Sequence, residues 1–159
     1  MTPEEKIAAI LENESLTIAL AESCTGGLLA GKITDIPGSS RYFMAGLVTY
    51  SNEAKTKFLS VPEEIITHNG AVSAIVAELM ATGVRDGVGV DIGLSITGIA
   101  GPAGGSPEKP VGMVFMGLAT KKGVSVERFL FIGDRLEIRR QATEAALRML
   151  LHYLEECFS

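Results

Sequence analysis

Histidine and cysteine are scarce in this 159-residue chain and tryptophan is absent. The few cysteines and histidines argue against a disulfide-stabilised protein, a cysteine metal site and a histidine-dependent hydrolase. The two cysteines, Cys24 and Cys157, cannot form a disulfide framework and do not have metal-ligand spacing. The two histidines, His68 and His152, fall in a turn-like and a helix-like segment, so we expect no Ser-His-Asp triad. The motifs G-x-S-x-G, G-x-x-x-x-G-K-[ST], H-E-x-x-H and C-x-x-C are also missing.

Long apolar runs and stripes of positive charge are missing too. No run approaches the roughly 20 apolar residues that cross a bilayer, and the N-terminus does not read as a secretory signal. We therefore expect a cytoplasmic protein with no membrane partner. The net charge is −5, and the one basic cluster is Arg135, Arg139 and Arg140, so no nucleic-acid partner is expected. These arginines could clamp the phosphate of a small ligand, or they could belong to a solvated helical face.

The chain has the apolar content of a folded domain, since 47% of its residues are hydrophobic. No linker or repeat divides it, so residues 1–159 are expected to form a single domain. Strand-like and helix-like segments alternate early, and a β-hairpin comes late. This order predicts an α/β fold, a three-layer α/β/α sandwich around a mixed sheet. The expected strands are 16–22, 42–50, 88–96, 111–120 and 124–132, and the expected helix caps are Thr2, Ser73 and Asp134.

Ser23 follows the first expected strand, at a glycine-containing turn into a helix. There its hydroxyl would meet the backbone N–H groups of Thr25, Gly26 and Gly27, which can stabilise an oxyanion or hold a phosphate. A simple helix cap at Ser23 or Thr25 explains the same pattern. Cys24 is a rival nucleophile, because a helix N-terminus lowers a thiol pKa. Alternation along the strand directs it away from Ser23, and we expect it to pack inward.

Without a histidine, a nucleophilic Ser23 needs another base, and a desolvated lysine can serve. Lys55 begins an apparent helix after an apolar strand, with Tyr50 and Ser51 close enough in sequence to relay or hold a proton. A solvated surface lysine is the alternative for Lys55. On composition alone, three other lysines are no less plausible as the base: Lys32, Lys57 and Lys109.

The segment 97–105 is too rich in glycine for an ordinary connection between two strands. Glycine lets the backbone approach a ligand closely, and Pro102 stiffens the loop. Because ligands of α/β folds gather at the carboxyl ends of strands, this loop and the turn at Ser23 are expected to face one cleft.

Six motifs in this order resemble the CinA C-terminal domain family, the nicotinamide-nucleotide amidohydrolases, and the resemblance covers about residues 3 to 155. The motifs are Ala21-Glu22-Ser23-Cys24-Thr25-Gly26-Gly27, Val48-Thr49-Tyr50-Ser51-Asn52-Glu53-Ala54-Lys55, Gly70-Ala71-Val72-Ser73, Thr97-Gly98-Ile99-Ala100-Gly101-Pro102 with Gly104-Gly105, Lys109-Pro110-Val111-Gly112, and Gly133-Asp134-Arg135 with Arg139-Arg140-Gln141.

The resemblance implies hydrolysis of nicotinamide mononucleotide to nicotinate mononucleotide and ammonia, without a metal or cofactor. It implies Ser23 as nucleophile, Lys55 as base and Tyr50 as an aid to proton transfer. Thr97 stands where relatives often have serine. The candidate substrate contacts are Cys24, Thr25, Gly26, Gly27, Thr97, Gly98, Ala100, Gly101, Arg135 and Arg140.

Other readings of the same motifs stay open. One is a nucleotide-binding or regulatory module with little or no turnover, and another is a hydrolase acting on a related amide. A homodimer is expected mainly because of the resemblance. The family's N-terminal domain, which is similar to molybdopterin-binding proteins, has no counterpart in this stand-alone sequence. We therefore do not expect the pyrophosphatase activity associated with that domain.

Overall fold

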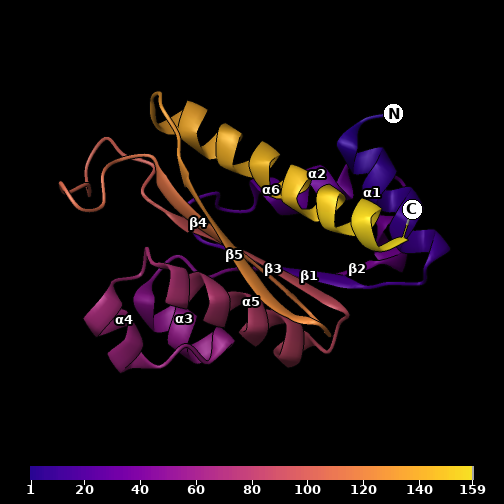
Figure 1. Cartoon of the computed structure of the whole chain (residues 1–159), viewed down its shortest axis with the longest axis horizontal. Coiled ribbons are helices and arrows are strands. Elements are labelled where there is room, and N and C mark those ends of the chain that lie inside the picture. The colour runs from indigo at the N-terminus through magenta and orange to yellow at the C-terminus, as the bar shows by residue number, and fades with distance from the viewer. Residues whose placement is uncertain (159) are drawn as a thin grey trace.

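The computed structural model describes residues 1–158 and has one five-stranded sheet with helices on both faces (Figure 1). The strand order is β2-β1-β3-β4-β5, in which β2, β1 and β3 are parallel and β4 and β5 form an antiparallel hairpin. The predicted α/β/α sandwich with a mixed sheet is confirmed. The strands are β1 (Ile18–Glu22), β2 (Phe43–Val48), β3 (Ile92–Gly98), β4 (Met113–Thr120) and β5 (Gly123–Leu130).

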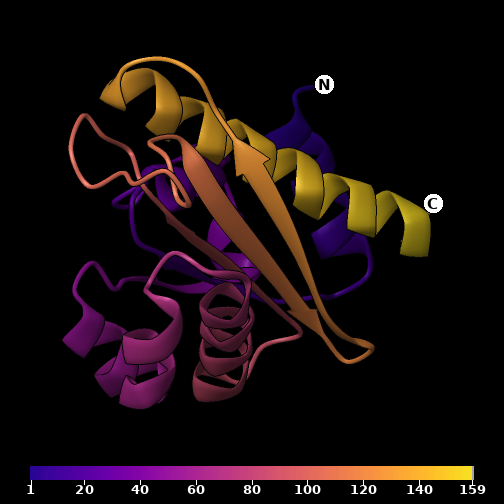
Figure 2. The same cartoon turned by 60° about the vertical axis from the view of Figure 1, so that its left-hand side comes forward.

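The helices divide into two layers. One layer contains α1 (Pro3–Asn13), α2 (Leu28–Thr34) and α6 (Arg135–Phe158). The other contains α3 (Asn52–Leu59), α4 (Glu63–Asn69) and α5 (Ala74–Val88), and a 3-10 turn, Ser39–Arg41, precedes β2. Figure 2 shows the long α6 lying across the sheet, on the side opposite to α5.

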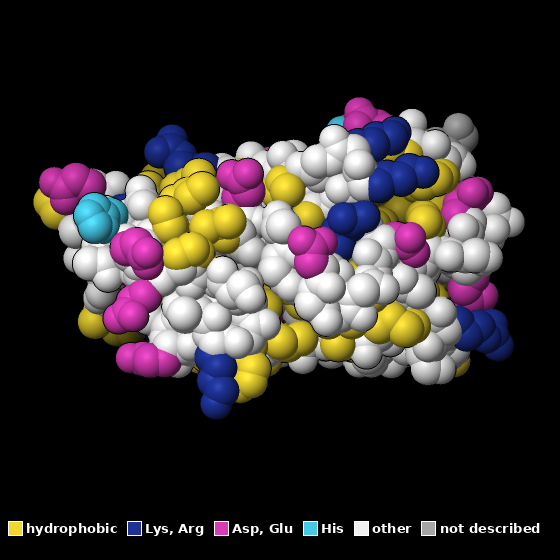
Figure 3. All heavy atoms as spheres, turned by 90° about the horizontal axis from the view of Figure 1, so that it is seen from below, with side chains coloured by type: hydrophobic (Ala, Val, Ile, Leu, Met, Phe, Trp, Pro, Cys, Tyr) yellow, Lys and Arg dark blue, Asp and Glu magenta, His cyan; other side chains and the backbone are white. Residues whose placement is uncertain are grey.

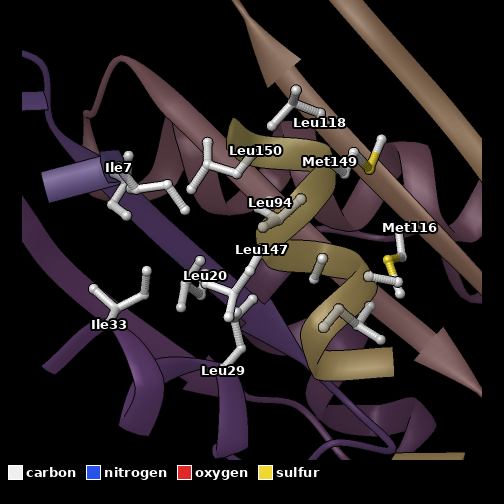
Figure 4. Close-up of a cluster of buried hydrophobic side chains, with 14 of the residues drawn as sticks. Ile7, Leu20, Leu29, Ile33, Leu94, Met116, Leu118, Leu147, Met149 and Leu150 are labelled. Carbon is white, nitrogen blue, oxygen red and sulfur yellow. The ribbon is translucent and has the colours of Figure 1, made fainter. Parts of the chain in front are cut away.

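The interior strand β1 is buried at every position because it faces both helical layers. Ile18 and Leu20 join the hydrophobic cluster under α1, α2 and α6, which Figure 4 shows in close-up. Ala19 and Ala21 join the cluster on the side of α3, α4 and α5. Residues 18–21 of β1 are therefore all apolar and do not alternate with polar residues.

Several helices begin at the predicted caps. Thr2 and Glu5 form a capping box on α1, and the Ser73 side chain accepts a hydrogen bond from the backbone at the start of α5. Asp134 Oδ1 likewise accepts from the Glu137 N–H at 2.9 Å. The prediction for 88–96 was wrong at its start, because α5 runs to Val88 and β3 begins only at Ile92. The helix is terminated by Gly89, which follows Val88 and whose φ of +81° suits glycine.

The register of the parallel strands brings three chain segments together at one edge of the sheet. Glu22, the last residue of β1, lies opposite Val48 of β2 and Ile96 of β3. The Ser23 N–H donates to Ile96 O at 3.0 Å, and the Thr49 N–H donates to Glu22 O at 2.9 Å. The residues that follow β1, β2 and β3 are therefore neighbours, as predicted for the turn at Ser23 and the glycine-rich loop.

The surface has no continuous band of one charge on the face drawn in Figure 3, where lysine and arginine side chains stand in separate groups among acidic ones. Among residues 1–158, no helix has both the length and the apolar composition needed to cross a membrane.

Candidate active site

The structure places Lys55 directly against Ser23. Lys55 Nζ lies 2.9 Å from Ser23 Oγ, and only 1% of Lys55 and 8% of Ser23 are exposed. Two backbone carbonyls also accept from Nζ, that of Thr49 at 2.7 Å and that of Tyr50 at 3.3 Å. Lys55 is therefore desolvated and within reach of the serine hydroxyl, and the solvated surface lysine is not what the structure shows.

Local structure brings Lys55 to this position. β2 ends at Val48, and Ser51 then caps α3, its side chain accepting from the Ala54 N–H at 3.0 Å. The cap fixes where the helix begins and directs Lys55, on its buried face, back toward the sheet edge. Lys55 and Leu59 are the buried residues of this helix.

Burial gives Lys55 the electronic property that a general base needs, because it lowers the pKa of the amine to about 8. A neutral amine has two N–H bonds and one lone pair. The carbonyls of Thr49 and Tyr50 can accept the two N–H bonds, which leaves the lone pair for the proton of Ser23. The geometry therefore suits removal of a proton from Ser23 near neutral pH.

The Tyr50 hydroxyl is bonded to Arg135, and among residues 1–158 no hydrogen bond joins it to Ser23 or Lys55. The carbonyl of Tyr50 accepts from Lys55, but its hydroxyl accepts from Arg135 Nη2 at 2.9 Å, and 59% of the residue is exposed. Arg135 Nη1 also donates to Gly101 O at 2.7 Å. Arg135 thus ties Tyr50 to the glycine-rich loop, and both ends of its guanidinium are already engaged.

A buried glutamate, whose role the sequence pattern did not reveal, stabilises the turn that carries Ser23. Glu22 is 1% exposed, and its carboxylate accepts from the Thr25 hydroxyl at 2.6 Å. It also accepts from N–H groups at the start of α2, those of Gly27 at 3.3 Å, Leu29 at 3.0 Å and Ala30 at 2.9 Å. A carboxylate is favourable at the positive end of a helix dipole, so Glu22 stabilises the junction between β1 and α2.

These bonds correct the prediction of three oxyanion donors in this turn. The Gly27 N–H is directed to Glu22 and the Gly26 N–H to Ser23 O, so neither points at a ligand. Gly26 instead has a φ of +58°, which favours glycine in a tight turn. Of the predicted donors, the N–H of Thr25 is left without an acceptor among residues 1–158.

Cys24 packs inward, as predicted. It is 4% exposed and belongs to the core cluster under α1, α2 and α6. Burial raises the pKa of its thiol to about 11, so the thiol stays protonated near neutral pH and is a poor nucleophile. The structure therefore favours Ser23 over Cys24 as the nucleophile.

The four candidate residues of the glycine-rich loop have structural roles that the sequence did not suggest. The Thr97 hydroxyl donates to Ala71 O at 2.8 Å, and Ala100 is 5% exposed in the core. A Cβ on Gly98 would lie 2.6 Å from a methyl group of Val114, and one on Gly101 would lie 2.5 Å from a methyl group of Val111. These two glycines are explained by close packing on β4 and the segment before it, and close approach of a ligand is not needed to explain them.

A groove of about 380 Å³ runs between α2 and α6. Lys32, Arg139 and Arg140 provide positive charge in its lining, and Leu28 and Leu136 provide apolar surface. Arg140 is exposed, whereas Arg139 is half-buried and donates to Cys24 O at 3.0 Å and to Thr25 O at 3.2 Å. Among residues 1–158, no group of three His, Cys, Asp or Glu side chains is arranged to hold a metal ion.

Comparison with known proteins identifies the family. Residues 1–154 match the CinA C-terminal domain. The chain belongs to the CinA family. A competence-damage inducible protein of Moorella thermoacetica is 58% identical to it over 149 residues, and a CinA-like protein of Citrifermentans bemidjiense is 53% identical over 151. These matches cover 94% and 95% of this chain but 36% of each relative, so the chain spans little more than a third of their length.

Solved CinA-family structures have the same fold. The competence/damage inducible protein CihA of Agrobacterium tumefaciens has a TM-score of 0.89 and 40% identity, covering 96% of this chain and 95% of that one. A CinA superfamily protein of Klebsiella pneumoniae has a TM-score of 0.92 and 31% identity, covering 98% and 99%. Their names refer to competence and damage and do not state a reaction.

Proposed function

We propose that this CinA-family domain is an amidohydrolase that deamidates nicotinamide mononucleotide, with Ser23 as nucleophile and Lys55 as general base. The observation that carries the proposal is the 2.9 Å contact between Lys55 Nζ and Ser23 Oγ around a buried amine. A structural lysine does not need a partner hydroxyl at a sheet edge, whereas a serine amidase without histidine does need such a base. The choice of substrate rests on the family resemblance.

The reaction proceeds through an acyl-enzyme. Neutral Lys55 takes the Ser23 proton as Oγ attacks the carboxamide carbon, and the N–H of Thr25 stabilises the tetrahedral oxyanion. The protonated Lys55 then gives its proton to the departing nitrogen, and ammonia leaves. Water, deprotonated by Lys55, attacks the acyl group, and collapse of the second intermediate returns the proton to Ser23 and releases nicotinate mononucleotide.

The groove between α2 and α6 is the proposed site for the phosphate. It begins beside the turn of Ser23, because Arg139 in its lining contacts Cys24 and Thr25. Arg140 is the better candidate for a phosphate contact, since its guanidinium is exposed, whereas Arg135 is engaged with Tyr50 and Gly101. Substrate would have to displace one of these contacts before Arg135 could bind it.

The test is ammonia release from nicotinamide, its riboside, its mononucleotide and NAD, measured for the wild type and for variants of Ser23 and Lys55. The wild type should prefer the mononucleotide. Ser23→Ala should lose activity by more than about 10³-fold, and Lys55→Ala by roughly 10² to 10⁴-fold. Lys55→Arg should not recover activity, because arginine cannot act as a neutral base.

Lys57→Ala is the matched control, because Lys57 is an exposed lysine on the same helix. It should retain wild-type turnover. Full activity in Ser23→Ala would remove Ser23 as nucleophile, and no turnover of any of the four amides by the wild type would favour a nucleotide-binding or regulatory module. Preference for a different amide would keep the hydrolase and change its substrate.

A further inference from the structure

The peptide between Cys24 and Thr25 is held from one side only. Its carbonyl, Cys24 O, accepts from Arg139 Nε at 3.0 Å, while its N–H, that of Thr25, has no acceptor among residues 1–158. The neighbouring N–H groups in the turn are engaged, since Gly26 donates to Ser23 O and Gly27 to Glu22. The unpaired N–H of Thr25 therefore belongs to the same peptide whose carbonyl accepts from Arg139.

The planar trans peptide links these two facts. Its C=O and N–H point in opposite directions, so whatever fixes the carbonyl also fixes the direction of the N–H. Arg139 belongs to α6, in one helical layer, and Lys55 reaches Ser23 from α3, in the opposite layer. Holding the carbonyl toward α6 therefore turns the N–H toward the layer where Ser23 Oγ meets its base.

We infer that Arg139 is a positioning residue for oxyanion stabilisation, which aims the Thr25 N–H at the reacting carbonyl of the substrate by holding Cys24 O. This role rests on the proposed amidase function of Ser23. Arg139 does not touch the reacting atoms. It acts through the backbone, and its second bond, from Nη2 to Thr25 O at 3.2 Å, fixes the next peptide as well.

The surroundings of Arg139 agree with this role. Its guanidinium forms no ion pair with a carboxylate in the described part of the chain, so its charge acts on the turn without being neutralised. A cation bonded to a carbonyl also polarises the peptide and makes its N–H a stronger donor. Gly26 leaves room for this side chain, since a Cβ there would lie 3.2 Å from Arg139 Nη2.

A direct phosphate contact is the competing role for Arg139, because it lines the groove between α2 and α6. The two roles predict different kinetics. An oxyanion donor stabilises the transition state of every amide substrate, so its misplacement lowers kcat whether or not the substrate carries a phosphate. A phosphate ligand contributes to binding, so its loss raises KM for the mononucleotide and leaves the riboside unaffected.

The experiment compares Arg139→Met and Arg139→Lys with the wild type on the mononucleotide and the riboside. In parallel, the rate at which a fluorophosphonate labels Ser23 is measured, because that reaction also builds negative charge on an oxygen beside the serine. Arg139→Met should lower kcat and the labelling rate roughly 10- to 100-fold, with KM little changed. Arg139→Lys keeps the charge and one hydrogen bond and should fall in between. Arg148→Met, an exposed arginine of the same helix, is the control and should behave as wild type.

A rise in KM confined to the mononucleotide would overturn the inference in favour of a phosphate ligand. Unchanged kcat and labelling would overturn it too, as would failure of both variants to fold, which would make Arg139 a structural residue. If the wild type releases no ammonia, the proposed function fails while the labelling rates still test Arg139. If the wild type neither releases ammonia nor is labelled at Ser23, both proposals fail. If it releases ammonia without being labelled, the proposed function stands and kcat of the Arg139 variants alone decides the inference.

Discussion

At the scale of single residues, the protonation of Lys55 should set the pH dependence of the reaction. Only the neutral amine can accept the Ser23 proton, and the pKa of Lys55 is lowered to about 8 by burial. We therefore expect kcat for ammonia release to rise with pH, about tenfold per pH unit well below 8, and to level off above it.

The measurement is kcat from pH 6 to 10 on one amide, with circular dichroism at each pH to show that the fold persists. A profile that falls with increasing pH, or that is flat across this range, would contradict the role of Lys55 as base. A rate that still rises tenfold per pH unit up to pH 10 would mean that burial does not lower the pKa of the amine from its ordinary value of about 10.5.

The sequence predicts some residues of the site better than others. Ser23 can be predicted from local signals, because a strand end followed by a glycine turn marks its position. The base cannot, because four lysines are equally plausible in the sequence and only the fold shows that Lys55 contacts Ser23. Arg139 has no local signal, since its acceptors are backbone carbonyls 115 and 114 positions earlier in the chain. Glu22 does have a local signal. An acidic residue that ends an apolar strand and lies three positions before a threonine can cap the next helix.

At the scale of elements, the cap of α3 should matter for activity as well as for stability. The Ser51 side chain accepts from the Ala54 N–H, and the next residue, Lys55, contacts Ser23. We expect Ser51→Ala to cost about 1 kcal/mol of unfolding free energy. Because α3 would fray at the end that carries the base, kcat should fall as well.

Thr2→Ala is the comparison variant, because Thr2 caps α1 at the start of the chain. Urea unfolding should show a similar loss of stability, while ammonia release should keep its wild-type kcat. Equal effects of the two variants on kcat would mean that the cap of α3 does not position Lys55.

Element boundaries were predictable where the signal is local and failed where it is not. The caps at Thr2, Ser73 and Asp134 stand directly before their own helices and accept hydrogen bonds from the first turn, so sequence alone identifies them. The apolar composition of 88–96 predicts a single strand, whereas α5 ends at Val88 and Gly89 turns the chain before β3. An apolar residue buried by a helix and one buried by a strand have the same composition, so only packing decides between them.

At the scale of the whole molecule, the buried amine should lower the stability of the fold near neutral pH. Unfolded Lys55 has a pKa of about 10.5 and folded Lys55 about 8, so between these values the unfolded chain binds more protons. The free energy of unfolding therefore rises as pH increases from 8 to 10.5. Below pH 8 the fold bears the full cost of burying the charged amine.

Lys55→Met removes the titration, so the stability difference between variant and wild type should depend on pH. The variant should be more stable relative to wild type at pH 7 than at pH 10, by on the order of 2 kcal/mol. The change with pH isolates the protonation of Lys55, since effects of the substitution that do not depend on charge, such as the altered packing of the side-chain stem, cancel between the two pH values. Urea unfolding at the two pH values measures it, and a difference that is constant or reversed would contradict a lowered pKa.

The order of the strands is the part of the fold that the sequence left undetermined. Alternating strands and helices predict a sheet with two helical layers, but not that β1 lies between β2 and β3. That order depends on long-range pairing, which places the ends of β1, β2 and β3 side by side. The site arises from this arrangement, because Ser23 and Lys55 come from segments 32 positions apart.

The buried carboxylate of Glu22 has a consequence for local motion. The first N–H groups of a helix ordinarily lack partners and exchange rapidly with solvent deuterium. At the start of α2, however, the amides of Leu29 and Ala30 donate to Glu22, whereas α4, which follows Pro62, has no side-chain cap. Hydrogen–deuterium exchange should therefore be slow at Leu29 and Ala30 and fast at Glu63 and Glu64. The reacting end of the sheet would then open only together with the core of the protein.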